Sequence, residues 1–167
     1  MCIRDRLSAG CILFLFWSIT RLVRALLVGD ERKLSVMDVI IILGAGFVGA
    51  LAYTFSDTFW FSAVEGEVYA FSSFLTALVF WMILRWQDEA DSVSGDRWII
   101  LIAYIIGLSI GVHLLNLLCI PAIVLVFYYQ KYQTLSLKGV IGAIALSGIL
   151  IVLILFVYIP GMADVGG

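Results

Sequence analysis

Apolar positions along the chain form six long runs separated by short polar or charged breaks. The runs cover residues 7–28, 39–55, 68–86, 98–116, 117–129 and 140–159. A helix needs about 20 residues to cross a hydrocarbon core about 30 Å thick. In lipid, each segment must satisfy its own backbone hydrogen bonds, and the chain lacks the ten-residue alternation of barrel strands. The pattern therefore predicts an all-α, polytopic transmembrane helical bundle with about six spans.

Composition supports this prediction and excludes other classes of protein. Of the 167 residues, 63% are hydrophobic and 13% are charged, and the mean hydropathy is +1.13, far above that of soluble domains. The net charge of −2 gives no clustered basic face for nucleic acid, so we expect a lipid bilayer and no nucleic acid among the partners. Three widely spaced cysteines predict neither a disulfide framework nor a zinc site.

Basic residues concentrate in alternate breaks, which predicts the orientation of the spans. Eight of the ten Lys and Arg residues lie in the segments 21–33, 85–97 and 131–138, and the exceptions are Arg4 and Arg6 near the N-terminus. Since cytoplasmic loops of membrane proteins carry the excess of Lys and Arg, these segments are expected on the cytoplasmic side. Residues 56–67 and the turn at 113–121 then face the outer side.

The 32 residues from Trp98 to Tyr129 contain no Asp, Glu, Lys or Arg. As one helix they would extend about 48 Å, which is too long for one crossing, whereas two helices of about 15 residues would reach only about 23 Å each. This length predicts a hairpin whose tip, from His113 through Asn116 to Pro121, lies below the outer membrane surface.

Three carboxylates, Asp57, Glu65 and Glu67, lie among aromatic residues in the outer loop. They are either solvated acids of an interfacial aromatic belt or functional acids, because acids embedded in apolar sequence are costly and tend to be functional. As functional groups they would serve acid–base chemistry or, at Glu65 and Glu67, hold a divalent cation. On a regular helix these two glutamates point about 200° apart, so they address one site only if Gly66 lets the chain extend.

Spacings of four and three residues place Ser109, His113 and Asn116 on one face of a predicted helix. The purely structural interpretation is that His113 is a membrane histidine that hydrogen-bonds a neighbouring helix. The functional alternative is that these three polar side chains line the tip of the hairpin below the outer membrane surface and face the same outer cavity as the carboxylates.

Glycines gather in two of the runs: Gly44, Gly46 and Gly49 lie close together in the second, and Gly107 and Gly111 are four residues apart in the fourth. Small residues at such spacing favour close helix packing. A nucleotide-binding role is excluded because no strand-to-loop context surrounds them.

Two segments carry a family resemblance. They are residues 55–73 and the stretch from Arg97-Trp-Ile-Ile to Gly107-Leu-Ser-Ile-Gly-Val-His-Leu-Leu-Asn116. The chain resembles bacterial, Bacteroidetes-type membrane proteins of unknown function that are grouped with protein O-mannosyltransferases. This resemblance implies the fold of the GT-C glycosyltransferase superfamily and a multi-pass location in the bacterial inner membrane. It also implies a periplasm-facing active site that takes a sugar from a polyprenyl-phosphate donor and transfers it to a protein or glycan acceptor.

The resemblance also implies roles for individual residues. The string Glu65-Gly66-Glu67 is similar to an acidic motif of the second outer loop in GT-C enzymes, which predicts Glu65 and Glu67 as catalytic residues and as possible metal ligands. His113 stands where relatives have a polar or basic residue near the donor phosphate. Asp57, His113 and Asn116 are thus predicted to bind substrate.

An acidic first outer loop, expected in the wider group, would precede Leu7. Residues 1–6 resemble a translated sequencing adaptor, or else the charged start of a signal-anchor. We therefore expect a non-native N-terminus at 1–6 and a partial GT-C-like domain at 7–167, inactive when isolated. The predicted function is a glycosyltransferase, with protein O-mannosylation as the reaction. The alternative is a polytopic carrier or flippase for a lipid-linked or small substrate.

Overall fold

The structure is a computed structural model, and it describes residues 3–28, 33–64, 68–90, 95–132, 136–158 and 160–161. Within these residues the chain is helical almost throughout and contains no strand. The helices are α1 (Ile3–Leu27), α2 (Val36–Thr54), α3 (Asp57–Val64), α4 (Tyr69–Glu89), α5 (Gly95–Val112), the 3-10 turn η1 (Leu114–Leu118), α6 (Cys119–Tyr132), α7 (Leu137–Leu153) and the π-helical turn η2 (Ile154–Tyr158). The all-helical prediction is confirmed.

Each of the six predicted spans contains one α-helix of at least 14 residues, but not all six helices are long enough to cross a membrane. Four described helices are long and apolar enough by length and composition, at residues 5–27, 36–54, 69–89 and 137–157. Helix α5 has 18 residues and α6 has 14, which agrees with the prediction that the stretch from 98 to 129 forms two short helices. The short helix α3 lies in the predicted outer loop and was not anticipated.

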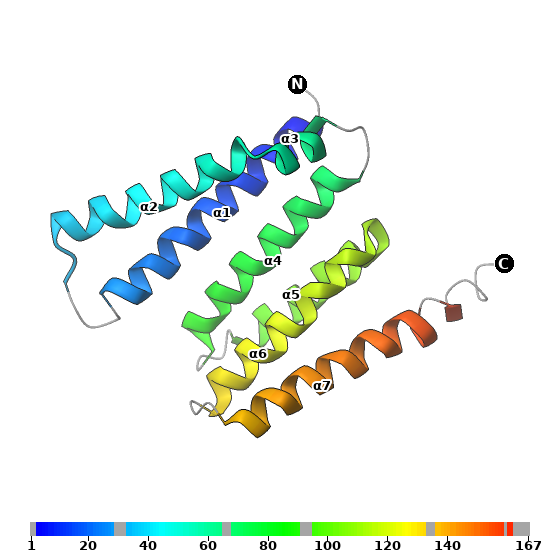
Figure 1. The fold of residues 1–167 in the computed structure, drawn as a ribbon. Helices are drawn as coiled ribbons and strands as arrows, with labels where there is room; N and C mark the ends of the chain where they lie inside the picture. The colour runs from blue at the N-terminus through cyan, green and yellow to red at the C-terminus, as the bar shows by residue number, and fades with distance from the viewer. Residues whose placement is uncertain are drawn as a thin grey trace. The chain divides into compact units, whose positions relative to one another are not determined.

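The chain divides into two compact units, residues 1–116 and 117–167. In the first unit α1 packs against both α2 and α4, and α4 packs against α5. Figure 1 shows these four long helices side by side in the order α2, α1, α4, α5. Their direction alternates along the chain, so the neighbours α1 and α4 run the same way. One end of the unit therefore collects the end of α2, helix α3, the start of α4 and the end of α5.

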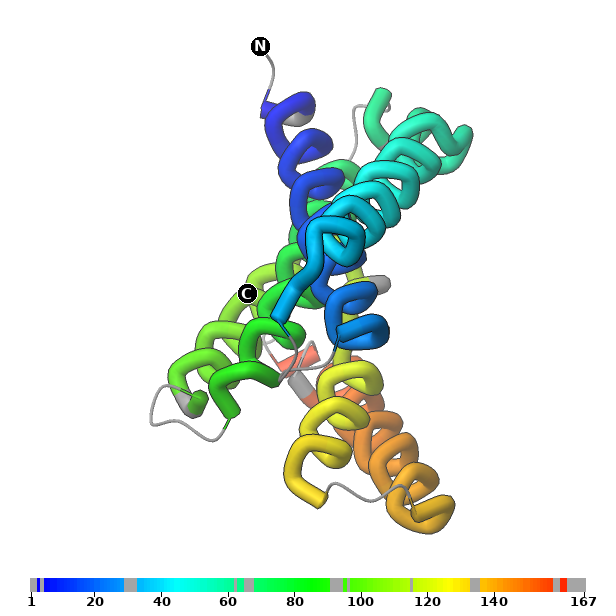
Figure 2. Tube along the Cα trace, turned by 90° about the vertical axis from the view of Figure 1, so that its left-hand side faces the viewer, coloured from blue at the N-terminus to red at the C-terminus, as the bar shows by residue number. Residues whose placement is uncertain are grey.

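Glycines allow α1 and α2 to approach closely where they cross (Figure 2). A Cβ atom added at Gly46 would lie against the Thr20 side chain and 3.0 Å from the ring of Phe16, and one at Gly49 would lie 2.6 Å from the Ile19 side chain. The predicted packing role is thus confirmed for these two glycines. A Cβ at Gly44 meets no described atom within 4 Å.

Gly107 and Gly111 differ from that prediction, because a Cβ at either position would meet no described atom within 4 Å. Spacing alone identifies a face on which backbones can approach closely. It does not supply a neighbouring helix at these two positions.

The other end of the first unit carries an exposed ionic network. The Arg21 guanidinium pairs with both carboxylate oxygens of Asp88, and Arg85 donates to Glu89 at 3.1 Å. The Trp98 indole N–H donates to the second oxygen of Glu89 at 2.9 Å. Helices α1, α4 and α5 are therefore joined at one end of the unit. The basic residues there predict that this end faces the cytoplasm.

In the second unit, α6 packs against α7, and Gly139 of α7 lies directly beneath the Tyr128 ring. Pro121, predicted to lie in the sunken tip, belongs instead to the first turn of α6. A proline is tolerated there because the N–H groups of a first helical turn have no intrahelical partner.

Candidate functional site

A buried amide joins α4 to the end of α5. The Oδ1 atom of Asn116 accepts hydrogen bonds from the Ser72 and Thr76 hydroxyls, both at 2.9 Å. Its Nδ2 atom donates to the Ser109 carbonyl at 3.3 Å. Asn116 and Ser72 are only 4% and 8% exposed, whereas Thr76 is exposed. The predicted substrate-binding residue Asn116 is thus engaged within the protein, and its hydrogen bonds favour an indirect role in the site.

The structure interrupts the predicted stripe of Ser109, His113 and Asn116. The stripe assumed one continuous helix, but α5 ends at Val112 and a 3-10 turn follows. The Ser109 carbonyl accepts the backbone N–H of His113 at 2.9 Å, as in a regular helix, and the Asn116 side chain donates to it as well. The Asn116 side chain thus folds back onto the last turn of α5.

His113 lies directly after α5, and its ring packs on the ring of Tyr69 at the start of α4. The two centroids are 5.4 Å apart and the planes are inclined by 48°. His113 is half-buried. The structure thus brings His113 to the first residue of the helix that follows the acidic segment.

Asp57 is the first residue of α3 and is exposed. Ser56 precedes the helix, and its hydroxyl oxygen accepts the Phe59 N–H at 3.3 Å while its carbonyl accepts the Trp60 N–H at 3.0 Å. Ser56 is therefore the N-cap of α3. A carboxylate in the first turn is stabilised by the helix dipole, which gives Asp57 a structural role besides the predicted one in substrate binding.

Helix α3 has one aromatic residue directed inward and two exposed. Phe59 is buried, with its ring centroid 4.7 Å from that of Tyr53. Trp60 and Phe61 are 60% and 67% exposed. Aromatic side chains of this kind are typical of the membrane–water interface.

The predicted catalytic residues Glu65 and Glu67 lie outside the described residues. In the sequence they precede Tyr69, the first residue of α4, and their catalytic roles stay predictions.

The predicted divalent cation has no site among the described side chains. In the described part of the chain, no three His, Cys, Asp or Glu residues lie close enough together to hold a metal ion. Since Glu65 and Glu67 fall outside that part, a metal at these two residues stays a prediction.

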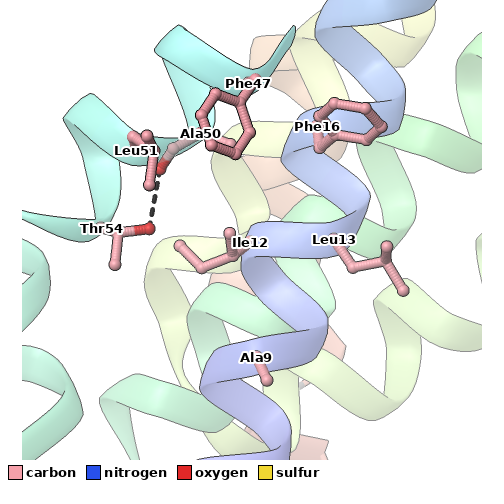
Figure 3. A pocket seen from close by; sticks show the side chains of 8 residues that line it. All are labelled: Ala9, Ile12, Leu13, Phe16, Phe47, Ala50, Leu51 and Thr54. Carbon is pink, nitrogen blue, oxygen red and sulfur yellow. Dashed lines mark hydrogen bonds between the residues drawn. The ribbon is translucent and has the colours of Figure 1, made fainter. Parts of the chain in front are cut away.

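An apolar groove with a volume of about 310 Å³ lies between α1 and α2, beside the point where they approach closely. Figure 3 shows its lining, which consists of Ala9, Ile12, Leu13, Phe16, Phe47, Ala50, Leu51 and Thr54. The one polar side chain, Thr54, donates its hydroxyl hydrogen to the Ala50 carbonyl at 2.7 Å. The groove runs from the close approach at Gly46 toward the end that carries α3, and its surface is suited to hydrocarbon.

Sequence reasoning missed Ser72 and Thr76, the two hydroxyl donors to Asn116. A usable signal was present, because two hydroxyl residues four positions apart lie on one face of an otherwise apolar helix. Hydroxyl and amide side chains within transmembrane helices commonly hydrogen-bond across to a neighbouring helix.

A known protein family matches most of the chain. The family described as the protein O-mannosyl-transferase TMEM260 N-terminal domain matches residues 5–136. The chain belongs to this family. The match confirms an O-mannosyltransferase-like family and points to a glycosyltransferase. The matched residues include Asp57, Glu65, Glu67, His113 and Asn116.

The two remaining comparisons add no relative. Neither the curated proteins nor the solved structures contain a match to the chain.

Proposed function

We propose that this chain forms the membrane part of a GT-C-type glycosyltransferase in the bacterial inner membrane. It takes mannose from a polyprenyl-phosphate carrier on the periplasmic side and transfers it to a hydroxyl group of a protein. The observation that carries this proposal is the family match over residues 5–136. Because that family is described as an N-terminal domain, activity belongs to the full-length protein that contains it.

The location of the proposed site follows from the ends of the first unit. His113 and Tyr69 meet at the end opposite the ionic network of Arg21 and Asp88. By the positive-inside rule, an end without the basic cluster faces outward. This orientation supports a periplasmic site built from the acidic segment 65–67 and His113.

The transfer reaction assigns a task to each side chain. The bond from the sugar C1 to the leaving phosphate oxygen breaks as the acceptor hydroxyl oxygen bonds to C1, and the hydroxyl proton passes to a carboxylate. We assign that base to Glu67, which directly precedes a spanning helix, where an acid needs a partner. Glu65 and Asp57 assist at the donor site, and His113 hydrogen-bonds the leaving phosphate.

The groove between α1 and α2 supports a lipid-linked donor. Its walls belong to two candidate membrane spans, and it extends toward the end that carries the proposed site. A polyprenyl chain lying there would keep its phosphate near the membrane surface, within reach of His113.

Carboxylate-to-amide variants of the full-length protein test the proposal. Glu67→Gln keeps size and hydrogen-bonding capacity, so folding is retained, and the transfer rate is expected to fall by about 10² or more while donor binding persists. Glu89→Gln is the matched control, because that carboxylate lies at the opposite end of α4. We expect the control to transfer at the wild-type rate.

The same variants separate a transferase from a carrier. A carrier would move the lipid-linked substrate across the membrane without forming a glycosylated product, and the variants would lose that movement. Wild-type transfer rates in both Glu65→Gln and Glu67→Gln would remove these residues from the mechanism.

A further inference from the structure

Helix α3 exposes apolar side chains although it is too short to cross a membrane. Its eight residues extend about 12 Å, which is less than half of a hydrocarbon core about 30 Å thick. We infer that α3 is an interfacial helix, which lies along the membrane surface and inserts Trp60, Phe61 and Val64 between the lipid headgroups and the acyl chains. The partner of this surface is the phospholipid bilayer. The inference concerns how the segment between α2 and α4 is anchored, so its test needs no sugar donor.

The neighbours of α3 place it at the ends of three candidate membrane spans. Helix α3 contacts α1, α2 and α4, each of which is long and apolar enough to cross a membrane, and Figure 1 shows it beside the end of α2. The 19 residues of α2 extend about 28 Å, close to the full thickness of the core. The Phe59 ring packs on the ring of Tyr53, which belongs to the last turn of α2, with the centroids 4.7 Å apart. The body of α3 therefore lies where this span leaves the hydrocarbon.

The connection between α2 and α3 is short and hydrogen-bonded. Only Phe55 and Ser56 separate the two helices. The Phe55 N–H donates to the Leu51 carbonyl at 3.0 Å, and the Ser56 N–H donates to the Tyr53 carbonyl at 3.1 Å. The Ser56 hydroxyl donates to the same Tyr53 carbonyl at 2.7 Å. Helix α3 thus begins directly at the end of α2, and no loop carries it away from the membrane surface.

The side chains of α3 point in three directions around its axis, at about 100° per residue. Phe59 points into the protein and is 6% exposed. Trp60, Phe61 and Val64 are each more than half exposed, and they share a sector about 100° wide that is centred about 150° from Phe59. Thr58, which is exposed, lies on the remaining side, about 110° from the centre of that sector. A helix that packs on a protein at a membrane surface has three such neighbours: protein, lipid and water.

The exposed carboxylate of Asp57 belongs to the first turn of α3. It points in the same direction as the apolar sector, but it lies about 5–10 Å nearer the start of the helix than the three apolar side chains. Because a carboxylate is costly inside lipid, the start of α3 lies nearer to water and its second half lies deeper. Trp60, Phe61 and Val64 all belong to that deeper half.

The size of the apolar sector favours lipid over a protein partner. The exposed parts of Trp60, Phe61 and Val64 together present about 300–400 Å², whereas a specific protein interface buries about 800 Å² on each side. The insertion of a few aromatic and aliphatic side chains is, by contrast, how interfacial helices bind a bilayer. Trp and Phe are also the side chains expected at this depth.

Spin labels on single cysteines of the full-length protein measure the depth of α3. The native cysteines are replaced, and the protein is reconstituted in vesicles of phosphatidylethanolamine and phosphatidylglycerol. A nitroxide at Val64→Cys samples the apolar sector without removing either aromatic ring. The label at Thr58→Cys is the matched control on the same helix, and a label at Val48→Cys, exposed within α2, provides the reference for the hydrocarbon core.

The readout is the ratio of nitroxide accessibility to molecular oxygen, which concentrates in hydrocarbon, and to a water-soluble nickel chelate. We expect the ratio at residue 64 to be about fivefold higher than at residue 58 and lower than at residue 48. Equal ratios at residues 64 and 58 would show that the sector faces water, and equal ratios at residues 64 and 48 would show that α3 enters the core. Low accessibility to both reagents at residue 64 would show that protein covers the sector. Each of these three results would overturn the inference.

A double variant tests whether the two aromatic side chains hold α3 at this depth. In the Val64→Cys protein, Trp60→Ser with Phe61→Ser should lower the accessibility ratio to within about twofold of that at residue 58. Tyr104→Ser is the matched control, because Tyr104 is as exposed as Trp60 but lies on α5, and it should leave the ratio unchanged. An unchanged ratio in the double variant would overturn the anchoring role. The comparison of labels needs neither substitution, so it decides the question even if the double variant does not fold.

Discussion

Replacing Gly46 by alanine tests how closely α1 and α2 are packed. The added methyl group would collide with the Thr20 side chain and lie 3.0 Å from the Phe16 ring. Gly44, two residues earlier on the same helix, is exposed and offers open space. The two glycines thus share a helix and differ in their neighbours, which makes Gly44→Ala the matched control.

The expected difference between the two variants follows from that geometry. Alanine is favoured over glycine inside a helix by about 1 kcal/mol, and this gain applies equally at Gly44 and Gly46. Overpacking a well-filled contact costs about 1–3 kcal/mol, and this cost applies only at Gly46. Gly46→Ala should therefore be about 1–3 kcal/mol less stable than Gly44→Ala.

Denaturant-induced unfolding in detergent micelles, followed by helical circular dichroism, measures this difference directly. The double variant Gly46→Ala/Thr20→Ser should recover part of the loss, because it removes the methyl group that the new side chain meets. Equal free energies of unfolding for Gly46→Ala and Gly44→Ala would refute the close contact between α1 and α2.

Three further outcomes are expected. A single cysteine at Ala90, in a background without the native cysteines, should resist an impermeant thiol reagent in sealed cells, and labelling there would reverse the predicted orientation. Ser18 has a buried hydroxyl without a hydrogen-bond partner among the described residues, so Ser18→Ala should raise the free energy of unfolding by about 1–3 kcal/mol; a loss of stability would show that the hydroxyl is satisfied. Arg21→Gln should change the free energy of unfolding by less than about 1 kcal/mol, since its partner Asp88 is 40% exposed and exposed ion pairs contribute little. A larger loss of free energy that salt does not reduce would contradict this.

The helices of this chain were predictable because lipid allows few alternatives. Each apolar run must form a helix to satisfy its backbone, so the runs located α1, α2, α4 and α7 closely. The division of residues 98–129 into two short helices also followed from length. Helix α3 was missed because a segment of eight residues has too few turns to show an apolar face, and its N-cap Ser56 is a single-residue signal.

The candidate site was less accessible to sequence reasoning because its contacts join distant residues. Spacing placed His113 and Asn116 on one side of a predicted helix, but the partners Tyr69, Ser72 and Thr76 belong to another helix. Periodicity reports which residues share a face and not which helix that face meets. The helix that the spacing argument assumed to continue also ends at Val112, before His113.

The two ends of the first unit use different chemistry to join helices, and the difference bears on where catalysis can occur. At one end, the part-buried Arg21 forms an ion pair with the exposed Asp88, where water can solvate the charges. At the other end, neutral hydroxyl and amide groups around Asn116 join α4 to α5 without burying a charge, which would be expensive inside a bilayer. The site proposed above is assigned to this second end. The groups that join α4 to α5 there are neutral, so the joint itself introduces no charge that would compete for a phosphate-linked sugar donor.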